Sequence, residues 1–208
     1  MKRFFVPAAV LLFLAAAAAD AAPRSSVRAA ANWRNVATST DRERLHDWRE
    51  AWTRALAEAR AAHRAEIDEE GVLLDPDAGQ AGAAPPPGDY RCRTIKLGAR
   101  ARDMLAYVDY PSFACRIGPA EAGNSMTFTK TGGSQRPVGR LFRHTARRMV
   151  FLGSLQLADE RGVLRYGHDV ERDLAGFVER IGPRRWRLIL PFPHFESLLD
   201  VIEIVPAS

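Results

Sequence analysis

Short alternating segments separated by turn residues fill the chain from residue 89 onward, and they constrain the fold more than any other feature. Tyr90, Cys92 and Thr94, for example, alternate with charged or aliphatic residues. This period of two places successive side chains on opposite faces of a strand. With no helical segment between them, the segments predict a mainly β fold, a small antiparallel barrel or sandwich of about eight strands. The expected strands lie near 89–97, 112–117, 124–130, 137–143, 147–157, 174–181, 184–190 and 199–205.

A helical pattern precedes these strands. The stretch "TDRERLHDWREAWTRALAEARAAHRAEI" opens with capping-box spacing, and Leu45, Trp48, Trp52 and later apolar residues recur at intervals of three and four. We therefore expect one long amphipathic helix near 41–66 whose apolar stripe packs against the β domain. An exposed stripe would instead suit docking to another protein.

The N-terminus has the three parts of a secretory signal peptide. Lys2 and Arg3 precede an apolar run that ends in the small-residue sequence Ala19-Asp20-Ala21. The run is about sixteen residues long, whereas a spanning helix needs roughly 20 apolar residues. We expect cleavage after residue 21, location in the periplasm, and a mature chain that does not span the membrane.

Composition along the chain predicts five segments. The segment "GQAGAAPPPG" reads as a linker, because its prolines cannot continue a helix. The expected order is a signal peptide (1–21), a flexible arm (22–37), a helical lead-in (38–78), a Pro/Gly linker (79–88) and the β domain (89–208).

Cys92 and Cys115 are the two cysteines of the chain, and each lies in an expected strand. In an oxidising compartment an isolated pair forms a disulfide. The alternative of a redox or metal-binding pair lacks both CxxC spacing and further zinc ligands. We expect a structural disulfide that joins the first two strands.

Several blocks of the sequence occur in an order typical of one bacterial family. They are "TDRERLHDWREAW", "GVLLDPDA", "GDYRCRTIKLG", "GSQRPVGRL", "MVFLG" and "ERIGPRRWRLILPFPHFESLLDVIEIVP". On these blocks the chain resembles the mainly alphaproteobacterial domain of unknown function 4893, over roughly residues 34–206. The resemblance implies an exported protein of this size and supplies no activity or catalytic residue.

Three loops carry candidate functional residues. "KTGGSQRP" (130–137) is a glycine-rich turn that could present N–H groups and Arg136 to an anion, or could be a plain hairpin turn. "YGHDVERD" (166–173) contains His168, which could ligate a metal with Asp169 and Asp173, or could lie in a solvated connection. "PFPHFESLLD" holds His194, Glu196 and Asp200, types suited to acid–base catalysis, in what could also be a structural turn.

The charges of the chain argue against a nucleic-acid partner. Of the 30 basic residues, 27 are arginine, and they are interspersed with 25 acidic residues rather than concentrated in one tract.

We favour a non-catalytic binding or protein-interaction module for a small apolar ligand or an envelope protein, without a metal or organic cofactor. The contact candidates are Arg136, His168 and His194. Two alternatives remain open: a hydrolase-like envelope enzyme that uses His194 and Glu196 or the 166–173 segment, and a structural envelope-assembly protein.

Overall fold

The computed structural model describes residues 32–119 and 125–207, together with Met1. The expected signal peptide and most of the expected arm lie outside the described residues. Within the described end of that arm, Trp33 is buried and meets the His144 ring edge-on at 5.4 Å between centroids.

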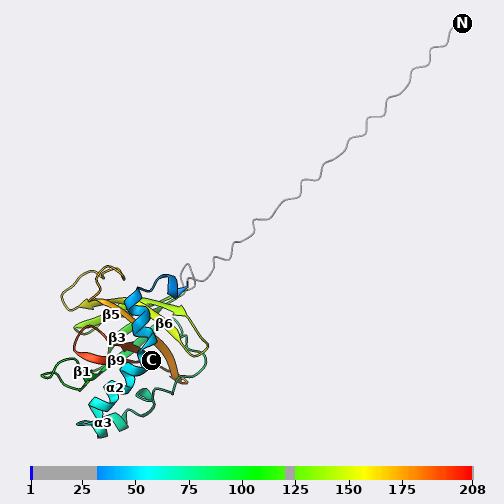
Figure 1. Ribbon diagram of the computed structural model, residues 1–208. Helices are drawn as coiled ribbons and strands as arrows, with labels where there is room; N and C mark the ends of the chain where they lie inside the picture. Colours follow the sequence, from blue (N-terminus) through cyan, green and yellow to red (C-terminus); the bar gives the residue numbers. More distant parts are fainter. Residues whose placement is uncertain (2–31, 120–124, 208) are drawn as a thin grey trace.

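Eight antiparallel strands form a closed barrel (Figure 1), which resolves the choice between barrel and sandwich. Each strand pairs with the next, and the last pairs with the first from Tyr90 opposite Pro206 to Ala99 opposite Ser197. All eight expected strands are confirmed. They are β1 (Gly88–Ala99), β3 (Phe113–Gly118), β4 (Met126–Lys130), β5 (Gln135–Arg143), β6 (Met149–Leu157), β7 (Asp173–Gly182), β8 (Arg185–Pro191) and β9 (Ser197–Pro206).

One short strand was not expected. β2 (Tyr107–Asp109) pairs with Ile95–Leu97 of β1, on the same edge that β3 pairs at Gly88–Cys92. Two strands therefore share one edge of β1, and β2 extends the sheet beyond the point where β3 leaves it.

The barrel strands bury apolar side chains on both faces. In β6, Phe151 belongs to the core inside the barrel, whereas Val150 and Leu152 belong to an outer core beneath the helices. A strand that is buried on both faces reads as a nearly continuous apolar run. This explains why "MVFLG" lacks the alternation of the other segments.

The expected single long helix is wrong, because the region forms three short helices: α1 (Ser39–His46), α2 (Trp48–Arg60) and α3 (Arg64–Glu69). The backbone leaves helical geometry at Asp47 (ψ 12°) and at His63 (ψ 41°). α1 contacts β7, whereas α2 contacts β1 and β9. Since the barrel wall curves, a chain of short helices can follow strands that one straight helix could not.

The apolar stripe itself is buried against the barrel as expected. Trp52 is 1% exposed and shares the outer core with Trp48, Leu45 and Leu56. Figure 1 shows α2, in cyan, lying across the strands. Among the helices that the structure describes, none is long and apolar enough to cross a membrane.

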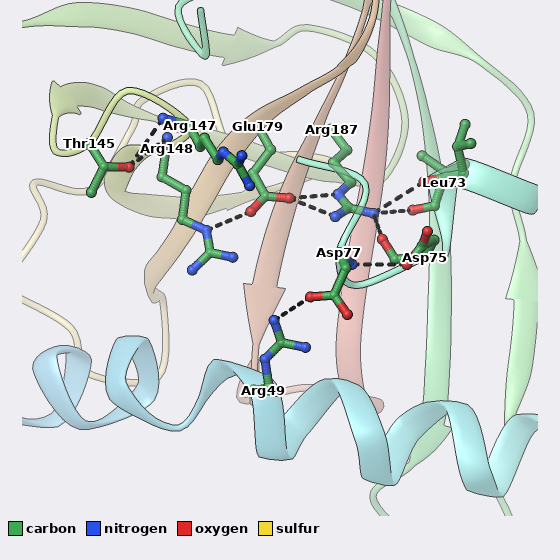
Figure 2. A network of polar contacts seen from close by, with 10 residues as sticks. Arg49, Leu73, Asp75, Asp77, Thr145, Arg147, Arg148, Glu179 and Arg187 are labelled. Atoms are coloured by element: carbon green, nitrogen blue, oxygen red, sulfur yellow. Dashed lines mark hydrogen bonds and ion pairs between the residues drawn. The ribbon is translucent and has the colours of Figure 1, made fainter. Parts of the chain in front are cut away.

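A buried arginine joins the helical lead-in to the barrel (Figure 2). Arg187 lies on the outer face of β8 and donates to the carbonyl oxygens of Leu73 (2.9 Å) and Asp75 (2.7 Å). It also donates to the Glu179 carboxylate on β7 (2.6 Å), and its guanidinium lies 4.6 Å from the Trp52 ring centroid. Arg187 and Glu179 are 0% and 1% exposed. The lead-in is thus held by charge-assisted hydrogen bonds as well as by apolar contact.

The Pro/Gly segment 79–88 also lies against the barrel. Gln80 N–H donates to Arg180 O (2.8 Å), and Gly82 N–H donates to Ala146 O (2.9 Å). Ala83 packs into the inner core at 4% exposure. This segment carries the chain from the outside of the barrel to the start of β1.

Candidate functional site

One end of the barrel interior is polar and contains a cavity of about 120 Å³. Along β1 the inward-facing side chains change from apolar to polar. Tyr90 and Cys92 belong to the apolar inner core, whereas Thr94 and Lys96 line the cavity. The apolar part of the lining comes from Phe113, Pro137, Leu155, Leu174, Leu190, Pro193, Phe195 and Ile202. The polar part comes from Thr94, Lys96, Tyr110, Lys130, Ser134, Gln135, His194, Glu196 and Asp200.

Lys96, from β1, has two carboxylate partners in this cavity. Its Nζ lies 3.0 Å from Asp200 Oδ2 and 3.3 Å from Glu196 Oε2. Burial by itself would lower the pKa of Lys96, but the charges and hydrogen bonds of Asp200 and Glu196 outweigh it and raise the pKa. Lys96 therefore remains an ammonium group, as expected of a buried cation that is paired.

Lys130, at the end of β4, has no such partner. Its Nζ donates to the carbonyl oxygens of Gly132 (2.8 Å) and Gln135 (3.0 Å), and the residue is 4% exposed. Among the residues that the structure describes, no carboxylate lies within ion-pair distance of this nitrogen. Burial, together with the positive charges of Arg136 and Lys96, lowers the pKa of Lys130 to about 8. It is a buried amine that is easily deprotonated.

The β8–β9 connection, residues 192–196, lies at the mouth of the cavity and is called the mouth loop here. Phe192 (φ 45°) and Glu196 (φ 68°) bound this loop and are the non-glycine residues with positive φ in the described chain. Such conformations cost of order 1–3 kcal/mol each and persist where the surrounding contacts impose them. The loop is therefore held in one shape over the cavity by the contacts around it.

Those contacts come from three directions. The Arg100 side chain donates to Pro193 O, and Arg100 N–H donates to Glu196 O (3.0 Å). Gln135 Nε2 donates to Glu196 Oε1 (3.2 Å). From α1, Arg44 contacts His194 Nε2.

The contact from Arg44 ties the mouth loop to the helical lead-in. Arg44 is itself held by Asp41 (3.1 Å) and by Asp173 O (2.9 Å). Burial and the nearby charges of Arg44 and Arg100 lower the pKa of His194. A neutral His194 can accept from Arg44 at Nε2, which leaves that nitrogen occupied.

The structure separates the three contact candidates. His194 lines the cavity, as do Glu196 and Asp200 of the same candidate segment. Arg136 donates to the carbonyl oxygens of Gly133 (3.1 Å) and Leu157 (2.7 Å), so it joins two connections at the same end of the barrel. Contact of His194 or Arg136 with a ligand stays a prediction.

The segment 166–173 contributes no residue to the cavity lining, and His168 is exposed on its turn. Tyr166 and Asp173 instead enter a buried polar cluster, where Tyr166 Oη donates to Asp41 (2.6 Å) and Gly167 N–H donates to Asp173 (2.9 Å). No group of three or more His, Cys, Asp or Glu side chains placed to hold a metal ion occurs within residues 32–119 and 125–207.

Sequence reasoning missed the two lysines of the cavity. Lys96 and Lys130 are, with Lys2, the three lysines among the 30 basic residues. The scarcity of lysine was the one feature of the sequence that could have drawn attention to them. That both side chains point into the barrel is seen only once the strands are paired.

The disulfide expectation is confirmed. Cys92 on β1 and Cys115 on β3 are bonded, with 5.9 Å between their Cα atoms, and both side chains lie in the inner core. The bond joins neighbouring barrel strands below the cavity, so it fixes the wall from which Lys96 projects.

A model of the family described as "Domain of unknown function (DUF4893)" matches residues 33–204. The match spans α1 to β9 and includes every residue of the cavity lining. No curated protein and no solved structure shows significant similarity to the chain.

Proposed function

Since this chain belongs to the DUF4893 family, whose description assigns no activity, we propose from the cavity itself that the protein binds a small organic molecule. The ligand is largely apolar and directs one hydrogen-bond acceptor at Lys130. The observation that carries the proposal is Lys130: a buried amine without a carboxylate partner in the described chain, in a cavity lined by apolar as well as polar side chains. Ligand sites commonly combine apolar walls with a few placed polar groups.

The size of the cavity limits the ligand. At about 120 Å³ it is somewhat smaller than an engineered protein cavity of ~150 Å³ that binds benzene. A single ring or a short aliphatic chain fits this volume, and a long lipid does not. The mouth loop, which Arg100 and Arg44 hold in place, forms part of the wall of this cavity.

Export to the periplasm is part of the same proposal. The signal-peptide pattern at residues 1–21 supports it, and so does the Cys92–Cys115 disulfide, since such bonds persist in oxidising compartments.

A binding function is favoured over a role as an envelope-assembly protein by the burial of Trp48 and Trp52, because docking through their apolar stripe would need the stripe to be exposed. A hydrolase role for His194 is weakened because Arg44 occupies its Nε2.

Calorimetry with a panel of single-ring and short-chain compounds tests the proposal. Compounds with an acceptor, such as benzyl alcohol and benzaldehyde, should bind more tightly than toluene. Lys130→Met should remove that difference, since methionine keeps the bulk of the side chain and loses the donor. Arg116→Gln is the matched control, because Arg116 is a cation on β3 whose side chain is 67% exposed and pairs with Asp89. If no compound of the panel binds, the proposal is wrong.

A further inference from the structure

Lysine is nearly confined to the cavity. Of the 30 basic residues three are lysine, and the two in the described chain, Lys96 and Lys130, both line this space. Elsewhere positive charge is supplied by arginine, including the fully buried Arg187. Arginine stays protonated in proteins, whereas a buried lysine can lose its proton and act as a base or a nucleophile. The distribution therefore points to chemistry that requires an amine.

Lys130 has the surroundings of a nucleophilic amine. A neutral amine carries two N–H groups, and Nζ has two carbonyl acceptors, on Gly132 and Gln135. The fourth position on nitrogen then holds the lone pair. With a pKa of about 8, about a tenth of the group is neutral at pH 7. Desolvation beside another cation is a recognised way of activating lysine toward carbonyl compounds.

Lys96 supplies the complementary charge. It lines the same cavity, and its pairs with Asp200 and Glu196 keep it protonated. A fixed ammonium beside a reacting carbonyl group stabilises the negative charge that develops on its oxygen. One lysine is thus suited to attack and the other to stabilise the oxygen.

We propose that Lys130 forms a reversible imine with the carbonyl group of a small aldehyde or ketone held in the cavity, an inference that rests on the proposed binding function. The Nζ lone pair forms the C–N bond while the carbonyl π pair moves to oxygen. The two hydrogens of the amine pass to that oxygen, which leaves as water as the C–N double bond forms. The reaction needs no oxidant or reductant, and hydrolysis reverses it.

Reductive trapping of the mature protein, whose amines are Lys96, Lys130 and the N-terminus after the expected cleavage, tests the imine. Benzaldehyde and sodium cyanoborohydride convert an imine to a stable benzylamine, which intact mass and peptide mapping locate. We expect labelling of Lys130 to exceed that of Lys96 and of the N-terminal amine by more than about tenfold. Denaturation in guanidinium should abolish this preference, and Lys130→Arg should remove the adduct. Equal labelling of all amines in the native protein, or a preference that survives denaturation, would overturn the inference.

Benzyl alcohol, which has the ring but no carbonyl, separates this inference from the function on which it rests. Calorimetric binding of benzyl alcohol without an adduct from benzaldehyde would refute the imine and leave the binding function standing. If neither compound binds and no adduct forms, both are refuted. A Lys130 adduct that benzyl alcohol suppresses by competition supports both.

Discussion

Lys96 and Lys130 face one cavity from strands β1 and β4, yet Lys96 has two carboxylate partners and Lys130 has none among the described residues. Their pKa values consequently move in opposite directions, up for Lys96 and down to about 8 for Lys130. Functional sites commonly contain two groups of the same type whose pKa values are shifted apart, so that one is charged and the other neutral.

Replacing Lys130 by methionine should remove a pH-dependent penalty on stability. The pKa of Lys130 is about 8 in the folded protein, against an ordinary value of 10.5, so the unfolded chain binds this proton more tightly. The penalty is therefore complete below pH 8, shrinks as the pH rises from 8 to 10.5, and is absent above that window. Its size is about 3 kcal/mol.

Urea unfolding of the wild type and of Lys130→Met at several pH values measures this penalty. The free energy of unfolding of the wild type relative to the variant should rise between pH 8 and pH 10.5. Comparison with the variant cancels the contributions of the other titrating groups, because both proteins contain them. If the difference in unfolding free energy between the two proteins stays constant from pH 8 to pH 10.5, the pKa of Lys130 is not lowered in the folded protein.

Removing the Arg187 side chain should destabilise the protein strongly. Arg187→Met leaves the buried Glu179 carboxylate without one of its cationic partners and takes the donor from Leu73 O and Asp75 O. Breaking such a pair costs about 3–5 kcal/mol. Arg49→Gln is the control, because the Arg49–Asp77 pair (2.7 Å) is exposed and should contribute little to stability. Equal losses for the two variants in denaturant unfolding would contradict this account of the network in Figure 2.

Truncating Trp52 tests whether the helical lead-in belongs to the same folding unit as the barrel. Trp52 is 1% exposed between α2 and the outer core, so Trp52→Ala should cost about 3–5 kcal/mol and lower the melting midpoint. Arg54→Ala, on the exposed side of α2, should change stability little. An unchanged midpoint for Trp52→Ala would mean that the lead-in contributes nothing to the stability of the barrel.

The disulfide should be present in protein isolated from the periplasm and should matter for stability. Intact mass after alkylation without reduction should show no modified thiol, and two modified thiols would contradict both the bond and the expected compartment. Cys92→Ala combined with Cys115→Ala should lower the free energy of unfolding by about 3 kcal/mol for a separation of 23 residues.

The strands were predictable because each is defined by its own local alternation, and the disulfide because the chain has two cysteines. The three-residue strand β2 has too few positions to form a pattern. The break at Asp47 was not predictable, because it depends on the curvature of a barrel that forms elsewhere in the chain. Local sequence thus predicted elements but not how they bend around one another.

The site was predicted less well than the fold. His194 and Glu196 were found because they cluster in one loop, but Lys96 and Lys130 lie on different strands and meet only through pairing of β1, β3 and β4. Arg136 drew attention as a cation beside a glycine-rich turn. Its hydrogen bonds to backbone carbonyls depend on the neighbouring connection after β6, which local sequence does not reveal.

Lysine-selective NMR tests the central claim, that a small molecule binds against Lys130, most directly. The expected cleavage after residue 21 leaves Lys96 and Lys130 as the lysines of the mature protein, so ¹³Cε labelling yields a spectrum in which Lys130→Met identifies the Lys130 signal. In the free protein we expect that signal to titrate with a pKa of about 8, and addition of benzyl alcohol should shift it saturably. A Lys130 signal that remains unchanged at saturating concentrations of every compound in the panel would contradict the account.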